Sequence, residues 1–158
     1  MKKVLFALLL LMITNSCTYK DEPILCCINV DTEISIRYLN QQGENLLALE
    51  NGIDFSQIKI FYKINNVWVE NFEANQDYPK GIRIIERENV KYLSLLPSVV
   101  FVEGNYSETK IEFSAQDADI IKTEVNINGP NTTVTKVWYN GVLKWEAYAT
   151  DRMFDIIK

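Results

Sequence analysis

The sequence predicts an all-β protein, an antiparallel β-sandwich of immunoglobulin-like or related topology. About nine short segments alternate apolar and polar residues with a period of two, which is the pattern of half-buried strands. Asn, Gly, Asp and Pro recur between these segments as turn residues. No amphipathic segment is long enough for a helix of more than two turns. An up-and-down β-barrel is the alternative, because several neighbouring strands are expected to be joined as hairpins.

The expected strands occupy most of residues 31–158, which we expect to form a single β domain. They are predicted at 32–40, 57–64, 67–72, 82–86, 90–96, 109–113, 120–127, 133–139, 142–146 and 153–157. The segment QQGENLLALENG interrupts the alternation. Its leucines are predicted to form one helical turn that closes an end of the core; they are Leu46, Leu47 and Leu49.

The segment KVWYNGVLKW contains the strongest hairpin signal. Asn140-Gly141 between β-rich flanks predicts a type I′ turn, because both positions tolerate positive φ. The predicted register pairs Tyr139 with Val142, Trp138 with Leu143, and Lys136 with Trp145. Trp138, Leu143 and Trp145 then share one face. We expect that face to belong to the core, with the Lys136 stem over Trp145.

A second hairpin is predicted at Asn65-Asn66. Its register places Phe61, Trp68 and Phe72 on one face, interleaved with charged residues. Flat rings stack on apolar surfaces while charges orient polar groups, so this face is a candidate platform for a glycan or peptide ligand. The same pattern also fits a strand face that a loop covers.

The first residues have the order of a secretory signal peptide, which we assign to residues 1–16. Two lysines precede an apolar run at 4–13, which is too short for the roughly 20 residues of a membrane-spanning helix. Ser16-Cys17 resembles the end of a bacterial lipobox, in which the thiol carries a diacylglyceryl group, although Thr14 stands where the usual pattern has Leu. Cys17 is therefore the expected lipidation site, and residues 17–30 the expected tether to a membrane.

The segment TYKDEP after Cys17 resembles the signal of a lysine and two acids that sends lipoproteins to the outer face of the outer membrane. The alternative is an ordinary solvated tail, with the protein on the periplasmic face. The formal net charge of −5 leaves no basic patch for nucleic acid.

Several chemistries are absent from the sequence. There is no histidine, which excludes the common catalytic triads and histidine-based zinc sites, and no glycine spacing fits a phosphate-binding loop. Cys26 and Cys27 are adjacent, so they are either two thiols on opposite faces of a strand start or a strained ring or intermolecular link. We expect no enzymatic activity and no cofactor.

Asp117 and Asp119 form a D-x-D pair between two expected strands. Such a pair can supply oxygen ligands to calcium or act as glycosidase carboxylates. Aspartate is also a standard turn residue that binds its own backbone, and this is the interpretation we favour over a metal site.

Two stretches resemble a known group of proteins. A strand leads to a Gly-acid-Leu-Leu turn at GENLL, and a KVWYNG hairpin precedes a final strand that ends in Lys. Together they resemble small, uncharacterised Bacteroidetes lipoproteins, with Asn45 where that family has Asp. The resemblance implies a lipid-anchored single domain and supplies no catalytic residue.

These observations lead us to expect a lipid-anchored outer-membrane protein that binds a glycan or protein at the cell surface. The first alternative is an accessory subunit of an envelope complex, which would use an exposed sheet edge such as the last strand. The second is a carboxylate-dependent hydrolase, which would need two carboxylates converging in a cleft.

Overall fold

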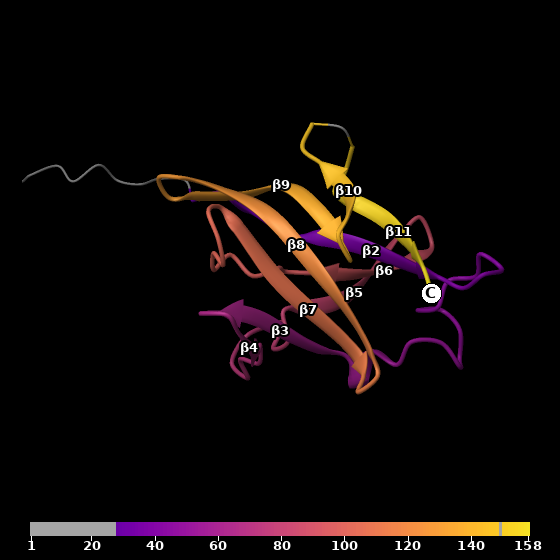
Figure 1. Cartoon of the computed structure of the whole chain (residues 1–158). Coiled ribbons are helices and arrows are strands. Elements are labelled where there is room, and N and C mark those ends of the chain that lie inside the picture. Colours follow the sequence, from indigo (N-terminus) through magenta and orange to yellow (C-terminus); the bar gives the residue numbers. More distant parts are fainter. Residues whose placement is uncertain (1–27, 149) are drawn as a thin grey trace, which may run out of the picture.

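The computed structural model describes residues 28–148 and 150–158, most of which lie in strands. Two sheets pack together, and neither closes into a barrel (Figure 1). The predicted β-sandwich is therefore confirmed, and the barrel alternative is wrong. The described residues contain no α-helix, and their one helical element is a 3-10 turn, η1, at Phe55–Gln57.

The first sheet has seven strands in the order β1-β9-β8-β7-β3-β4, with β10 also paired to β9. In Figure 1 this sheet lies in front of the other one. Its strands are β1 (Val30–Asp31), β3 (Lys59–Ile64), β4 (Val67–Glu70), β7 (Tyr106–Ser114), β8 (Asp117–Asn128), β9 (Asn131–Tyr139) and β10 (Val142–Glu146).

The second sheet has four strands in the order β11-β2-β6-β5. They are β2 (Ile34–Leu39), β5 (Ile82–Arg87), β6 (Val90–Leu95) and β11 (Met153–Ile157). Pairing is antiparallel except that β1 runs parallel to β9 and β11 runs parallel to β2. Parallel pairs require crossover connections, and here the chain changes sheet between β1 and β2 and between β10 and β11.

The core fills the space between the sheets with residues from alternate strand positions. The first sheet contributes Ile60, Ile111, Ile121, Val125, Val134 and Val137, and the second contributes Ile34, Ile36, Leu93, Leu95 and Ile156. Burying one such side chain fully is worth about 1.5–3 kcal/mol, so this shared core holds the two sheets together as one domain.

Both predicted hairpin turns are present, and both have the two positive φ angles of a type I′ turn. Asn65 and Asn66 have φ of 50° and 63°, and Asn140 and Gly141 have φ of 48° and 81°. At the first turn the predicted register is confirmed, since Ile64 pairs with Val67 and Tyr62 with Val69.

At the second turn the predicted register holds for two residue pairs and then shifts. Tyr139 pairs with Val142 and Trp138 with Leu143, but a bulge then pairs Trp145 with Val137. A bulge inserts one residue into one strand and therefore moves every later side chain to the opposite face.

The predicted tryptophan face of the core is therefore wrong. Trp145 is buried with Val137 and Tyr139, whereas Leu143 is 48% exposed and Trp138 lies on the outer side of β9. The Lys136 stem is not over Trp145. The guanidinium of Arg152 lies 4.6 Å from the centre of that ring instead.

The leucine segment also differs from the predicted helical turn. Residues 45–52 form non-helical turns, which are closed by backbone bonds such as Ile53 N–H to the Leu46 carbonyl at 2.8 Å. Leu46 and Leu47 pack on the core, and Leu49 is exposed. Two leucines rather than three thus cover this end, because a hydrogen-bonded loop places the third outward.

Candidate binding surface

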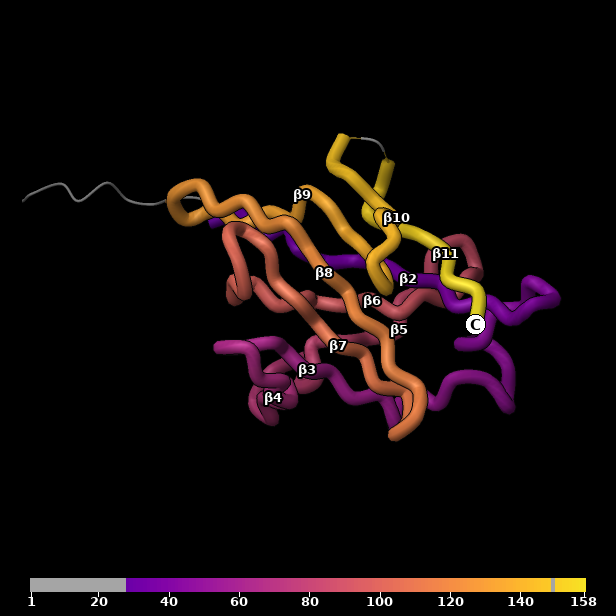
Figure 2. Tube along the Cα trace, viewed as in Figure 1, coloured from indigo at the N-terminus to yellow at the C-terminus, as the bar shows by residue number. Residues whose placement is uncertain are grey.

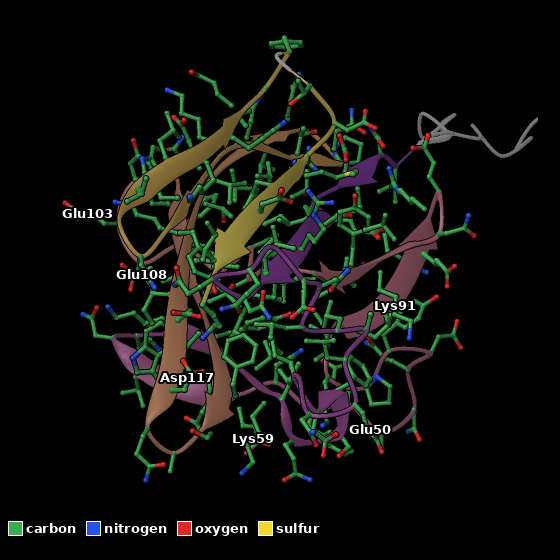
Figure 3. All side chains as sticks on the ribbon, turned by 90° about the vertical axis from the view of Figure 1, so that its right-hand side faces the viewer. Glu50, Lys59, Lys91, Glu103, Glu108 and Asp117 are labelled. Carbon is green, nitrogen blue, oxygen red and sulfur yellow. The ribbon has the colours of Figure 1, made fainter. Side chains whose placement is uncertain are left out.

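The outer face of the seven-stranded sheet carries an ordered array of aromatic and charged side chains. It consists of Phe61, Lys63, Trp68, Tyr106, Glu108, Lys110, Glu112, Lys122, Glu124, Lys136 and Trp138. These residues alternate with the buried positions of β3, β7, β8 and β9, which is why they point away from the core. In Figure 3 the labelled Glu108 lies on this side, away from the sheet that carries Lys91.

One end of the outer face is built by β4, β3 and β7. Lys63 and Trp68 are cross-strand partners, and the Lys63 ammonium lies 5.5 Å from the centre of the Trp68 ring. Lys110, from β7, lies 3.9 Å from the centre of the Phe61 ring and 6.0 Å from that of Trp68. The structure therefore brings together Phe61 and Trp68, which the sequence predicts as one platform.

The other end of the outer face is built by β7, β8 and β9. The Tyr106 and Trp138 rings meet edge to face with centres 5.9 Å apart. The Lys122 ammonium lies 4.2 Å from the centre of the Tyr106 ring. The aromatic platform thus continues across β7 to β9, beyond the hairpin in which the sequence predicts it.

Ion pairs fix three lysines of the outer face. Lys63 binds Glu108 at 2.7 Å and Lys110 binds Glu112 at 2.9 Å. Lys136 lies 3.3 Å from Glu146 and 3.6 Å from Glu124. The rings are partly exposed, and no loop covers them in the described part of the chain. Lysines lie over the rings of Phe61, Trp68 and Tyr106 instead.

A ligand that stacks on these rings must first displace the lysines. A cation–π contact at an exposed site is worth about 0.5–1 kcal/mol, so displacing one is a small cost. The freed ammonium groups then lie beside the ligand as hydrogen-bond donors. The arrangement suits a ligand with both flat apolar faces and polar groups.

Phe72 does not join this array. It follows β4 rather than lying within it, and it is 59% exposed. Among the described residues, no ring contact links it to Phe61 or Trp68. Phe72 is an exposed neighbour of the platform.

Sequence reasoning did not find Tyr106, Lys110, Lys122 and Trp138 as members of the outer face. The alternation in β7, where Tyr106, Glu108 and Lys110 separate buried residues, was the available signal. The pairing of β3 with β7 was not accessible from the sequence, because these strands are distant along the chain.

Asp117 and Asp119 belong to an ion-pair cluster. The Lys158 ammonium lies 2.6 Å from Asp117 and 2.8 Å from Asp119. The Tyr139 hydroxyl donates to Asp119 at 2.5 Å, and the Asn140 amide donates to it at 2.7 Å. The two aspartates are therefore strand residues of β8 rather than turn residues, and an ammonium group lies between their carboxylates.

The protonation of this cluster follows from these contacts. Burial raises the pKa of Asp119, but hydrogen bonds from Lys158, Tyr139 and Asn140 outweigh it and hold the pKa below the ordinary value. Burial raises the pKa of Tyr139, and the neighbouring Tyr38 and Asp119 raise it further. No group of three or more potential metal-ligating side chains occurs among the described residues.

A polar cleft of about 390 Å³ lies beside the segment that connects β10 to β11. Three carboxylates line it, those of Asp31, Glu33 and Asp151. Each faces an arginine: Asp31 faces Arg152 at 3.0 Å, Glu33 faces Arg83 at 3.1 Å, and Asp151 faces Arg87 at 3.6 Å.

The pKa of Glu33 does not suit general-acid catalysis. Burial raises the pKa of Glu33, but hydrogen bonds from Ser94 and Arg83 outweigh this effect and hold the pKa below its ordinary value. A general acid for hydrolysis needs a raised pKa.

A second hollow, of about 460 Å³, separates the edge strands β10 and β11. Its lining is mainly apolar and includes Leu39, Val142, Ile156 and Ile157. Because β11 is the edge of the four-stranded sheet, its unpaired backbone groups flank this hollow.

The remaining predicted residues, Cys17, Cys26 and Cys27, lie outside the described residues. Within the described part of the chain, no helix is long and apolar enough to cross a membrane. No family model, curated protein or solved structure matches the chain. The interpretation of function therefore depends on the chain's own sequence and geometry.

Proposed function

We propose that this chain is a lipid-anchored cell-envelope protein of the outer membrane that binds a ligand on the outer face of its seven-stranded sheet. The observation that carries the binding proposal is the continuous array of rings and lysines from β4 to β9. Four lysine–ring contacts lie on this one face, whereas such contacts occur roughly once per 70–80 residues in proteins. This density favours a binding surface over an ordinary solvated sheet.

The charge balance of the outer face favours a neutral, polar ligand. Together with its neighbours Lys59, Glu70 and Glu146, the outer face carries lysines and glutamates in equal numbers. They are Lys59, Lys63, Lys110, Lys122 and Lys136 with Glu70, Glu108, Glu112, Glu124 and Glu146. A strongly charged ligand would meet as much repulsion as attraction. A glycan has apolar ring faces and many hydroxyls, so we propose a glycan as the ligand class. A protein ligand is the alternative.

Replacing Trp68 tests the binding surface. Trp68→Ala should weaken glycan binding at least tenfold, because it removes one ring of the array, and should leave the fold intact because Trp68 is not a core residue. Val69→Ala is the matched control, since Val69 neighbours Trp68 on the opposite face of β4 and is 46% exposed. A glycan array followed by titration of tryptophan fluorescence measures both variants. Equal affinities for both variants would overturn the proposed surface, and binding to proteins alone would assign the protein alternative.

The proposed anchor needs its own test. Cys17→Ser should release the chain from the membrane fraction, and protease treatment of intact cells should remove the domain if it faces outward. A chain that stays in the membrane fraction after Cys17→Ser would contradict the anchor. Protection from the protease would assign the periplasmic face.

An accessory subunit remains the second candidate, and the hollow between β10 and β11 favours it. An extended segment of another envelope protein can pair with the free edge of β11 and place apolar side chains beside Val142 and Ile157. Ile157→Lys, at a position 64% exposed, should then abolish co-purification of that protein. An unchanged set of co-purifying proteins would remove this candidate.

The hydrolase is the third candidate and has the least support. Its carboxylates would be those of the cleft at Asp31, Glu33 and Asp151, which all face arginines. Paired carboxylates of this kind serve as structural ion pairs more readily than as a general acid.

A further inference from the structure

One end of the sandwich gathers four segments that are distant in sequence. At this end the β8–β9 turn closes, the β3–β4 turn closes, and the loop 97–105 leads from β6 into β7. The first described residues join them, since Asn29 accepts a backbone bond from Thr132 at 2.9 Å. Figure 2 shows the turns and this loop on the same side of the molecule, at the left. We call this the tether end.

The tether end exposes apolar side chains that belong neither to the core nor to the outer face of the sheet. They are Ile28, Val30, Val67, Val99, Val100, Phe101 and Ile127, and they are between 40% and 66% exposed. Single exposed apolar residues are ordinary, but a group of seven at one end marks an interaction surface.

The β8–β9 hairpin explains part of this exposure. Val30 and Ile127 are both cross-strand partners of Thr132, so all three side chains lie on the face that would face the core. Val125, two residues before Ile127, is buried, but Ile127 is 51% exposed. The hairpin thus extends past the second sheet, as its position at the left of Figure 1 shows, and leaves a core-type face uncovered.

The tether end also carries little charge. Residues 28–30, 64–67, 97–105 and 125–135 contain one charged residue, Glu103, whereas charged residues make up 23% of the chain. The opposite end differs, and Figure 3, viewed from that end, shows Glu50, Lys59 and Asp117 there. The apolar surface therefore lies at one end of the strands, and more of the charged residues lie at the other.

We propose that the tether end docks on the lipid surface to which the chain is anchored, which rests on the proposed lipidation of Cys17. Residue 28 is eleven positions after Cys17, so the tether end lies within roughly 40 Å of the anchor even when the linker is fully extended. An anionic lipid surface repels acidic groups. The tether end, in which Glu103 is the one charged residue of these segments, is the part of this acidic protein that meets the least repulsion at such a surface.

The docked geometry gives the outer face a defined orientation. The tether end lies at one end of the strands, so the strands point away from the bilayer. The outer face of the sheet is then roughly perpendicular to the bilayer plane and does not press against the lipid. Ligand then reaches Trp68 and Trp138 from the side, and the lipid surface does not block it.

Site-specific quenching tests the docking. The full lipidated chain is reconstituted in vesicles of phosphatidylethanolamine and phosphatidylglycerol with brominated acyl chains, which quench tryptophan on contact. Phe101→Trp places a reporter in the tether end, and Phe55→Trp is the matched control at the opposite end. The two phenylalanines are 40% and 36% exposed. The native tryptophans supply a constant background, which the wild-type chain measures.

We expect the emission added by Phe101→Trp to fall at least twofold in brominated vesicles, and the emission added by Phe55→Trp to stay unchanged. Ile127→Trp provides a second reporter if Phe101→Trp does not fold. Equal quenching at both ends would overturn the docking. Blue-shifted but unquenched emission at position 101 would also overturn it, because a second copy or the chain's own segment 18–27 would then cover the end.

Flotation of the wild-type chain with the same vesicles separates the two proposals. A wild-type chain that does not float has no anchor, and both the anchor and the docking fail. A chain that floats through Cys17 but shows no selective quenching keeps the anchor and loses only the docking.

Discussion

At the residue scale, a network of buried polar groups joins distant parts of the chain; among the described residues, Arg152 Nε is the one buried side-chain nitrogen or oxygen without a hydrogen-bond partner. Asp119 receives hydrogen bonds from Tyr139 and Asn140 and an ion pair from the terminal Lys158. Tyr38 extends the network, since its hydroxyl lies 3.3 Å from that of Tyr139. Such a satisfied network stabilises one arrangement of β2, β8, β9 and the C-terminus, because each unpaired member would be costly.

Asp119→Asn tests this network. The folded pKa of Asp119 lies below its unfolded value, so its contribution to the free energy of unfolding is fully present above the unfolded pKa and is lost as pH falls through the folded pKa. The free energy of unfolding of the variant should be about 1–3 kcal/mol lower than that of wild type at neutral pH. As pH falls below roughly 5, the free energy of unfolding should decrease less in the variant than in wild type, because the variant has no carboxylate to protonate at this position. Urea unfolding between pH 3 and 7 measures both.

The control for this variant is Asp117→Asn. Asp117 binds the same lysine, but its side chain is 49% exposed, so the loss at neutral pH should be smaller. Equal losses for the two variants would contradict the role of burial.

The same cluster predicts the response to calcium. The Lys158 ammonium occupies the space between the two carboxylates that calcium would need. The melting temperature should therefore be the same in millimolar calcium and in a chelator, as measured by differential scanning calorimetry. A higher melting temperature in calcium would restore the metal-site hypothesis for Asp117 and Asp119.

Arg152 is the second residue whose burial predicts an effect. Its side chain is 9% exposed, lies over Trp145, and donates to Asp31 and to the backbone carbonyls of Glu33 and Val134. Arg152→Lys should cost about 1–3 kcal/mol, because lysine cannot serve these acceptors together. Arg87→Lys is the control, since the ion pair of Arg87 with Asp151 is exposed and its replacement should leave the urea midpoint unchanged.

At the scale of elements, the conformation of each hairpin turn determines how its two flanking strands pair. Asn66 adopts φ of 63° and Gly141 adopts φ of 81°, in the left-handed region that glycine enters without strain. Asn66→Gly should therefore raise the free energy of unfolding by up to about 1 kcal/mol, and Gly141→Ala should lower it by about 1–2 kcal/mol. Opposite shifts of the urea midpoint are the expected result, and a loss of stability in both variants would contradict the turn assignment.

These hairpins also show how far sequence reasoning reaches at this scale. The Asn65-Asn66 register is predicted in full, because two short strands joined by a tight turn leave one way to pair. The Asn140-Gly141 register is predicted for two pairs and fails at the bulge before Trp145. The bulge brings Trp145 under Arg152 and into the core, and that contact is between elements rather than within the hairpin.

At the scale of the whole molecule, the assembly of strands creates the outer face. Phe61 and Trp68 come from one hairpin, but Lys110 comes from β7 and Trp138 from β9. The array exists because β3 pairs with β7, which joins two halves of the chain into one sheet.

The three tryptophans should report this assembly. Trp145 is 8% exposed, whereas Trp68 and Trp138 lie on the outer face. Acrylamide should therefore quench two classes of emission, and Trp145→Phe should remove the protected class. Saturating ligand should protect only the accessible class, which steady-state quenching measures. Uniform quenching of all three tryptophans would contradict this arrangement.

By itself the sequence determined the all-β class, the positions of most strands and both hairpin turns, because alternation and turn chemistry are local properties of a few neighbouring residues. It also placed Phe61 and Trp68 on one face of their hairpin. Only the tertiary structure decided which strands are neighbours, which face of β9 is buried, and that Lys158 lies between Asp117 and Asp119. The physical reason is distance along the chain. The contacts that settle these points join residues such as Arg152 and Asp31, which are 121 positions apart, and no short-range pattern records such a contact.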